Sequence, residues 1–241
     1  MRWALILGSS GDIGTQTAMD LAEKGWSLYL HYYKGQKKTI ELQQQLHHDH
    51  PKQDFLLIQA DLTLIDSVET ISQQLFALDA VIFAQGTTDY GLFVKADPAA
   101  LSQMLKMQVE VPLHLVQCLQ DKLAMSGHGR IVFVGSVYGG SGSAMEVGYS
   151  TVKGALSAFV AAYSQEVASL GITANVVAPG AVSTKMNLTF TPQERQEISS
   201  QIPAGYFAKP SEISYWICSM LDQQASYLTG QTIYVTGGWL K

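Results

Sequence analysis

Short runs of apolar residues alternate with longer segments of mixed polarity along the whole chain. The apolar runs are centred on Leu5, Leu28, Leu57, Val81, Val132, Val176 and Val235. Unbroken apolar runs of this length are typical of strands that are buried on both faces of a parallel sheet. The segments between them can form helices. The pattern therefore predicts an α/β fold with a parallel sheet covered by helices on both faces.

A glycine-rich segment follows the first apolar run directly. Residues 8–14 read GSSGDIG, and a helical pattern then extends from Thr15 to Lys24 and stops at Gly25. A turn between a strand and a helix can bind a pyrophosphate, because glycines let the backbone approach the phosphates and the helix N-terminus offers free N–H groups. The order of these elements indicates a dinucleotide site at the start of the chain.

The end of the second apolar run bears on the choice of cofactor. A fold that binds NAD usually has an acidic residue there for the ribose 2′-hydroxyl. Residues 31–34 read HYYK instead, and Lys37 and Lys38 follow. A cluster of cations beside Tyr33 and Lys34 could hold a 2′-phosphate, which favours NADPH over NADH. The same lysines could equally form the solvated start of a helix.

Asp61 follows the apolar run over residues 55–58. Its carboxylate could accept a hydrogen bond from an adenine amino group. Aspartate is also a favoured helix cap, so Asp61 could instead begin the next helix. Its position in the sequence leaves both interpretations open.

The candidate catalytic group is Ser136 with Tyr149 and Lys153. Residues 149 and 153 are four positions apart, so on a helix they lie on one face. A neighbouring ammonium would lower the pKa of the Tyr149 phenol from its usual value of about 10. Ser136 follows an apolar run and could hold a carbonyl oxygen while Tyr149 delivers a proton. The arrangement suits carbonyl reduction, whereas a Tyr-x-x-x-Lys pair alone often marks only a solvated helix face.

Composition narrows the class of protein. The chain has 241 residues, of which 47% are hydrophobic, and a formal net charge of −5. This is consistent with one domain over residues 1–241. No basic patch extends beyond the short lysine cluster, so neither nucleic acid nor a membrane is expected as a partner.

Cysteine and histidine usage adds two expectations. Cys118 and Cys218 fall in apolar helical contexts and are predicted to be reduced core residues of a cytoplasmic protein. His47, His48 and His50 precede Pro51 at a polar helix end, without a second ligand group at a suitable spacing. We expect a solvated helix terminus there and no metal site.

Together these motifs resemble the short-chain dehydrogenase/reductase family. The matching pieces are GSSGDIG, Asp61-Leu62, Ser136 with Tyr149 and Lys153, NVVAPGAVST over residues 175–184, and YLTGQ with VTGG over residues 227–238. Segments GRIVFVGSVYG and EVASLGITANVVAPG are most similar to bacterial 3-oxoacyl-(acyl carrier protein) reductases. The resemblance implies a single-domain Rossmann-type doubly wound sheet of seven parallel strands in the order 3-2-1-4-5-6-7. It also implies a homotetramer.

The resemblance assigns a role to each matching position. Tyr149 would be the catalytic acid/base, Lys153 would bind the nicotinamide ribose and tune Tyr149, and Ser136 would orient the carbonyl. The implied cofactor-binding residues are Gly8, Ser10, Asp12, Ile13, Gly14, Tyr33, Lys34, Asp61, Leu62, Gly86, Tyr149, Lys153, Pro179, Gly180, Val182 and Thr184. Residues 185–207 would form a substrate lid.

Three positions depart from the family pattern. Asp12 replaces the middle glycine of the turn, and we expect it to cap the following helix. Residues 83–86 read FAQG where the family has Asn-Asn-Ala-Gly, so only Gly86 is retained. Gln108 takes the place of the catalytic asparagine and could still hold a proton-relay water through its amide.

The resemblance also bears on the substrate. Carrier-protein reductases use arginines that flank the mouth of the active site, and the corresponding positions here are Gly127 and Leu170. Their loss argues against a carrier-protein substrate. The chain also resembles elongation factor P 5-aminopentanone reductases, whose ketone is borne on a protein. A third hypothesis, from another class, is a non-catalytic sensor or scaffold that binds NADP.

Overall fold

The computed structural model describes residues 1–187 and 190–239. Its seven-stranded sheet has the order β3-β2-β1-β4-β5-β6-β7, and every neighbouring pair is parallel. The strands are β1 (Arg2–Leu7), β2 (Trp26–Tyr32), β3 (Phe55–Gln59), β4 (Ala80–Phe83), β5 (Arg130–Val134), β6 (Thr173–Pro179) and β7 (Thr232–Val235). The predicted fold class and strand order are confirmed, and each predicted strand centre lies within a strand.

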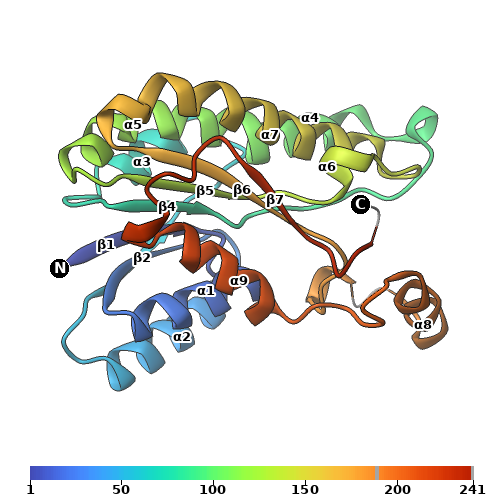
Figure 1. Ribbon diagram of the computed structural model, residues 1–241, viewed down its shortest axis with the longest axis horizontal. Helices are drawn as coiled ribbons and strands as arrows, with labels where there is room; N and C mark the ends of the chain where they lie inside the picture. The colour runs from blue at the N-terminus through green and yellow to red at the C-terminus, as the bar shows by residue number, and fades with distance from the viewer. Residues whose placement is uncertain (188–189, 240–241) are drawn as a thin grey trace.

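Helices cover both faces of the sheet (Figure 1). One face carries α3 (Ser67–Ser72), α4 (Pro98–Leu105), α5 (Val111–Met125), α6 (Tyr138–Ser141) and α7 (Val147–Val167). The other face carries α1 (Asp12–Glu23), α2 (Gln36–Asp49) and α9 (Pro210–Met220), whereas α8 (Pro192–Gln201) stands beyond the end of the sheet. Short turns are η1 (Phe93–Lys95), η2 (Lys106–Glu110), η3 (Ala168–Leu170), η4 (Lys185–Asn187) and η5 (Gln223–Ala225).

The two layers explain why the strands read as unbroken apolar runs. In β1, Leu5 and Leu7 belong to the core cluster on one face of the sheet, while Ala4 and Ile6 belong to the cluster on the other. Successive side chains of a strand point to opposite faces, so both sets must be apolar when both faces are covered.

The parallel topology brings all carboxyl ends of the strands to one edge. The glycine-rich turn after β1, Ser136 after β5 and the segment after β6 therefore meet at that edge. Gly127 precedes β5 and Leu170 precedes β6, so both lie at the opposite, amino edge. The expectation that these two positions flank the mouth of this chain's own site is wrong. Within one chain, these positions therefore do not border the candidate site.

Two local predictions also fail. Helix α1 begins at Asp12 rather than at Thr15, because the glycine-rich turn leads directly into the first helical residue. Cys118 is exposed, because its position on α5 faces away from the core, whereas Cys218 on α9 is buried. The apolar neighbours of Cys118 in sequence belong to other faces of the same helix.

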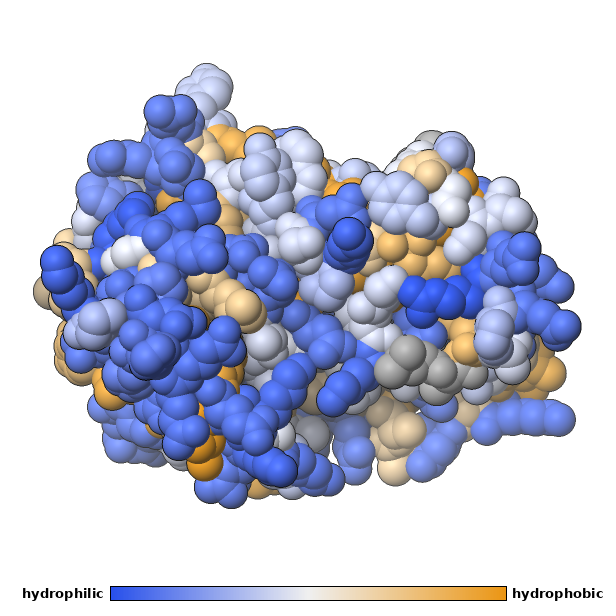
Figure 2. Space-filling view, turned by 90° about the horizontal axis from the view of Figure 1, so that it is seen from below, coloured by the Kyte–Doolittle hydropathy of each residue, from blue (hydrophilic) through white to orange (hydrophobic). Residues whose placement is uncertain are grey.

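Hydrophilic residues cover most of the face seen in Figure 2, on the side of the sheet that carries α1, α2 and α9, with smaller apolar patches between them. Within residues 1–187 and 190–239, no helix is both long and apolar enough to cross a membrane.

Candidate active site

The first turn of α7 brings the candidate acid to the carboxyl edge. Tyr149 lies two residues after the start of α7, is partly buried, and shares a side-chain hydrogen bond with Ser136. The Ser136 Oγ also accepts the backbone N–H of Tyr138 at 3.2 Å, which fixes its position at the end of β5. Two hydroxyl groups therefore meet at one point, where they can hold a single carbonyl oxygen.

Lys153 lies one turn along α7 from Tyr149, as the spacing predicts. Its side chain is only 4% exposed, and its Nζ lies 5.5 Å from the centroid of the Tyr149 ring. The Nζ donates a hydrogen bond of 2.9 Å to the carbonyl of Val134, the last residue of β5. Burial lowers the pKa of this ammonium to about 8.

The predicted lowering of the Tyr149 pKa is wrong for the protein without a bound dinucleotide. Burial of the phenol raises its pKa to about 12, the hydrogen bond with Ser136 opposes that rise, and the charge of Glu146 adds to it. Lys153 does not offset the burial, because its own ammonium is desolvated and bonded to the Val134 carbonyl. Tyr149 is therefore fully protonated near neutral pH.

Gln108 lies in the π-helical turn η2, between α4 and α5, and is buried. Its Nε2 donates to the carbonyl of Thr87 at 2.9 Å, whereas its Oε1 has no hydrogen-bond partner among the described residues. A Cβ on Gly86 would lie 3.1 Å from that Oε1 and 3.6 Å from the Lys153 Nζ. Gly86, Gln108 and Lys153 thus converge behind Tyr149.

The glycine-rich turn has the geometry that a dinucleotide requires. Gly8 has a φ of +80°, and a Cβ there would lie 2.7 Å from the backbone nitrogen of Gln85. A Cβ on Gly14 would lie 2.3 Å from the carbonyl oxygen of Gly8. The N-cap of α1 is Gly11, so no side chain satisfies the first amides of the helix. These free N–H groups fit a pyrophosphate, the acceptor that helix N-termini favour.

The prediction that Asp12 caps α1 is wrong. Asp12 is the first helical residue, and its Oδ1 instead accepts the Lys38 Nζ at 3.0 Å. Its Oδ2 accepts the backbone N–H of Lys185 at 2.6 Å. Partial burial raises the pKa of this carboxyl, but the bonds from Lys185 and Lys38 outweigh it and hold the pKa below its usual value. Asp12 therefore joins the turn to α2 and to the segment after β6.

The cations after β2 divide into different environments. Lys38 pairs with Asp12, and Lys37 pairs with Glu41 at 3.9 Å on an exposed face of α2. The Lys34 Nζ lies 5.1 Å from the centroid of the half-exposed Tyr33 ring. Ser10 packs against Gly35, where a Cβ would lie 2.5 Å from the Ser10 Cβ. This surface could hold a phosphate, and it is also a solvated helix start.

Asp61 does not cap a helix, because the N-cap of α3 is Asp66. Its Oδ1 accepts the backbone N–H and the hydroxyl of Thr63 at 2.9 and 2.8 Å. Tyr33 also hydrogen-bonds to the Asp61 carboxylate. Leu62 is buried, and Ile13 is partly buried against the core. This part of the site can form one wall of an adenine pocket.

The segment after β6 borders the turn on its other side. Gly180 approaches Thr236 so closely that a Cβ would lie 3.1 Å from its Cα. Pro179 accepts the Val137 N–H at 2.8 Å, and buried Val182 forms a bridge with Ala208. The Thr184 N–H donates to the carbonyl of Val182 at 2.8 Å. The predicted nicotinamide-side residues therefore lie in one ordered turn.

Two residues near the site belong to no sequence motif, so the sequence predicts no role for either of them. Glu146, at the N-cap of α7, accepts the Thr88 hydroxyl at 2.7 Å and raises the pKa of Tyr149. His31 is 3% exposed; its Nδ1 accepts the Gly8 N–H at 3.2 Å, and its Nε2 lies 3.1 Å from the Ala60 carbonyl. These contacts assign the Nε2–H tautomer. Burial lowers the pKa of His31 to about 4.

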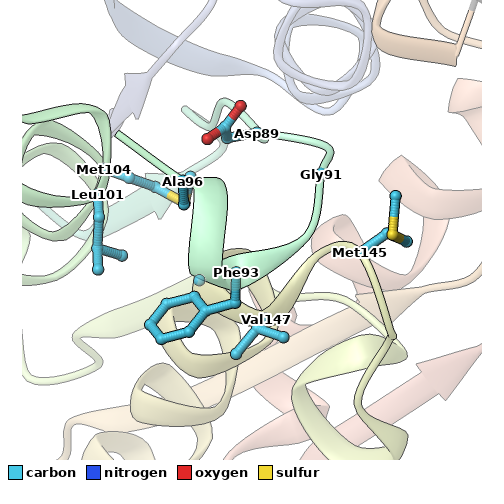
Figure 3. A pocket seen from close by; sticks show the side chains of 9 residues that line it. Asp89, Gly91, Phe93, Ala96, Leu101, Met104, Met145 and Val147 are labelled. Atoms are coloured by element: carbon cyan, nitrogen blue, oxygen red, sulfur yellow. The ribbon is translucent and has the colours of Figure 1, made fainter. Parts of the chain in front are cut away.

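The loop before Tyr149 contains one residue with a strained backbone and is held by a hydrogen bond from a second loop. Met145 has a φ of +69°, the only positive value for a non-glycine residue in the described chain, and its carbonyl accepts the Gly91 N–H at 2.8 Å. A cavity of about 20 Å³ lies beside it (Figure 3), lined by Asp89, Gly91, Phe93, Ala96, Leu101, Met104, Met145, Val147 and Gly148. A space of that size holds about one water.

The chain is similar in sequence and in overall fold to several known proteins. A family profile described as short chain dehydrogenase matches residues 2–195. The uncharacterized oxidoreductase YmfI of Bacillus subtilis is 38% identical, over 98% of both chains. The 3-oxoacyl-[acyl-carrier-protein] reductase FabG of Escherichia coli is 28% identical, over 98% of this chain and 96% of its own. The angucycline C-6 ketoreductase LanV, solved with bound NADP, has a TM-score of 0.92 and 25% identity, over 99% of this chain and 95% of its own.

Proposed function

This chain belongs to the short chain dehydrogenase family and is an NAD(P)-dependent oxidoreductase acting on carbonyl or hydroxyl groups, and from that premise we propose that it reduces a ketone to an alcohol with NADPH. The observation that carries this proposal is geometric: the Ser136 and Tyr149 hydroxyls share a hydrogen bond, and the Lys153 Nζ lies 5.5 Å from the Tyr149 ring centroid. Two hydroxyls at one point can hold a carbonyl oxygen, and the phenol can give that oxygen a proton.

The residues of the site divide the reaction between them. Ser136 and Tyr149 hold the carbonyl oxygen, and Tyr149 gives that oxygen its proton. When bound, a reduced nicotinamide would supply the hydride for the carbonyl carbon. Lys153 stands behind Tyr149 and stabilises the phenolate that remains. The unpartnered Oε1 of Gln108 can accept a hydrogen bond from a water that returns the proton to Tyr149.

We assign the cofactor to the turn from its free amides and from its cations. The residues from Gly8 to Gly14 would hold the pyrophosphate, and Asp61 and Leu62 would border the adenine. Gly86 lies beside Gln108 and Lys153 and would leave room for the cofactor there. Lys34 and Lys38, with Tyr33, favour a 2′-phosphate and therefore NADPH rather than NADH. Residues 179–184 border the nicotinamide. The NADP held by the LanV structure supports this choice.

Residues 185–207 are proposed as a substrate lid, of which residues 188–189 lie outside the described part of the chain. The helix α8 within this range has no buried residue, and it stands beyond the carboxyl edge of the sheet (Figure 1). A capping box joins Thr191 and Glu194, so α8 can persist as a helix without packing on the core. A homotetramer is proposed on the family resemblance, and light scattering would measure its mass.

The first test is NADPH consumption with acetoacetyl-coenzyme A, with Tyr149→Phe as the matched variant. The variant loses only the phenolic oxygen. We expect turnover to fall by a factor of about 10² to 10⁴, the usual contribution of a general acid. NADPH binding, measured by fluorescence, should remain. The sensor hypothesis predicts no turnover in either protein, with NADPH still bound.

A second candidate is reduction of an amine-bearing ketone, such as the protein-borne 5-aminopentanone of elongation factor P. The observation that favours it is the presence of two carboxylates in this region: the charge of Glu146 acts on Tyr149, and Asp89, from the loop after β4, lines the same small cavity as Met145. These carboxylates could hold a substrate ammonium and would repel an acidic carrier protein.

Two ketones of equal length separate the candidates. If the second holds, the (4-oxopentyl)trimethylammonium cation, which cannot cyclise to an imine, should be reduced with a higher kcat/KM than its neutral isostere 6,6-dimethyl-2-heptanone, and Glu146→Gln should remove the preference. A preference for acetoacetyl-coenzyme A that Glu146→Gln leaves unchanged would eliminate it.

A further inference from the structure

The amino edge of the sheet holds a second cavity, far from the reaction. It has a volume of about 360 Å³ and is lined by Arg2, Trp26, Asp79, His128, Arg130, Leu221 and Gln223. Three of these residues begin strands: Arg2 begins β1, Trp26 begins β2 and Arg130 begins β5. The candidate active site lies at the other ends of the same strands, roughly 15 Å away at about 3.3 Å per residue.

Arg130 is built into the wall of this cavity. It is only 2% exposed, and its Nη1 donates to the carbonyls of Gly129 and Gly171 at 3.0 and 3.5 Å. Its Nε is buried and has no hydrogen-bond partner among the described residues. That Nε is enclosed by protein, so a ligand in the cavity does not reach it. The Nη2 makes no hydrogen bond to a described residue and is the group of Arg130 that remains to bind an acceptor in the cavity.

The remaining groups add positive charge and one carboxylate. The Arg2 guanidinium lies 4.5 Å from the centroid of the Trp26 ring and donates to the Lys24 carbonyl at 3.4 Å. The Asp79 Oδ2 accepts the backbone N–H of Trp3 at 2.7 Å, so part of that carboxylate is already satisfied. Asp222 acts electrostatically on Arg130 from outside the lining. Two arginines and His128 thus face one lining carboxylate.

We propose that this cavity is a binding site for a small oxyanion, a phosphate or a carboxylate, held by Arg130 and Arg2. Guanidinium groups present planar, paired donors that match both kinds of anion. The volume lies at the lower end of the range for small-molecule sites. The site shares no residue with the candidate active site.

The test is calorimetric titration of the protein saturated with NADPH, so that the dinucleotide site cannot accept the added anion. The probes are inorganic phosphate and acetate, each compared with chloride at equal ionic strength. We expect one of the two to bind and to raise the melting temperature. Binding of phosphate alone would identify a phosphoryl ligand, and binding of acetate alone would identify a carboxylate ligand.

Matched variants locate the binding. Arg130→Met should weaken it at least about tenfold, as expected for loss of a charge-assisted hydrogen bond. Arg2→Gln removes an exposed side chain that the fold does not need, so it tests the site even if the Arg130 variant unfolds. Lys52→Gln removes one exposed positive charge outside the cavity and should leave the affinity unchanged.

Two results would overturn the proposal. One is that neither phosphate nor acetate binds to the NADPH-saturated protein beyond the effect of chloride. The other is that Arg2→Gln and Lys52→Gln change the affinity for the anion equally. The binding would then depend on the net charge of the protein and not on this cavity.

Discussion

The two ends of the candidate site are built in different ways. Around Tyr149, the important groups are partly or fully buried and are held by backbone groups: the Ser136 hydroxyl by the N–H of Tyr138 at the start of α6, and the Lys153 ammonium by the carbonyl of Val134 at the end of β5. Around Asp12, the groups are charged, partly exposed and joined mainly to each other. Burial shifts pKa values at the first end, and solvent screens the charges at the second. We infer that the first end performs the chemistry and the second only selects the cofactor.

Among the changes proposed here around Tyr149 and Asp12, replacing Lys153 should reduce the reaction rate most. In Lys153→Met the phenolate left after proton donation has no cation behind it, so we expect the rate to fall by a factor of about 10² or more. Steady-state kinetics at saturating NADPH would measure this loss. Lys95→Met, an exposed lysine on η1, is the control and should keep the rate. Equal losses in both variants would contradict the role of Lys153.

The same variant should change the pH dependence of stability. The pKa of Lys153 is about 8 in the folded protein and 10.5 as a free side chain. The unfolded chain therefore binds more protons between these values, and the wild-type free energy of unfolding should rise across that window by about 3 kcal/mol. Lys153→Met should lack this rise in urea unfolding. An identical pH profile would show that Lys153 is not desolvated.

His31 joins the glycine-rich turn to the segment after β3, and its protonation should weaken the fold. Its pKa is about 4 when folded and 6.5 when free, so the stabilisation is complete above pH 6.5 and is lost as the pH falls toward 4. The expected loss is about 3 kcal/mol. The comparison of His31→Gln with His47→Gln, an exposed histidine on α2, would isolate it. If both variants keep the wild-type pH profile, protonation of His31 does not cause the loss of stability.

Lys38→Met should change cofactor recognition and leave the chemical step around Tyr149 unchanged. Loss of one cation at the 2′-phosphate should weaken NADPH binding by about tenfold and leave NADH nearly unchanged. Lys37→Met is the matched control, since Lys37 lies in the same helical turn and its side chain is 91% exposed. Fluorescence titration gives both dissociation constants. Equal weakening of NADPH and NADH would assign Lys38 to structure instead.

The smallest effect is expected from Asp12→Asn. The amide keeps the shape of the side chain but frees Lys38 and removes a negative charge near the phosphates. We expect NADPH to bind a few-fold more tightly, in line with the small energies of exposed ion pairs. The same titration would measure it. Weaker binding would show that Asp12 positions Lys38 rather than competing for it.

The sequence predicted the parts that depend on periodicity and on spacing. The strand centres follow from unbroken apolar runs, and the i,i+4 spacing places Lys153 beside Tyr149. It could not predict the raised pKa of Tyr149, because burial and the contact of Lys153 with Val134 arise from residues distant in sequence. The local sequence predicts a helix cap at Asp12, because it does not show the two partners that hold this carboxylate. Lys38 and Lys185 lie on other elements and meet Asp12 only in the fold. His31 and Glu146 gave no signal, since each acts through tertiary contacts.

We infer that the residues around Tyr149 perform the chemistry and that those around Asp12 select the cofactor. The most direct test is single-turnover oxidation of NADPH at saturating cofactor, in Tyr149→Phe and Lys38→Met. The substrate is the ketone that the wild-type protein reduces fastest. We predict that saturation restores the wild-type rate to Lys38→Met and leaves Tyr149→Phe slower by a factor of about 10² or more. If Lys38→Met stays slow at saturation, or Tyr149→Phe recovers, chemistry and recognition are not separated as proposed.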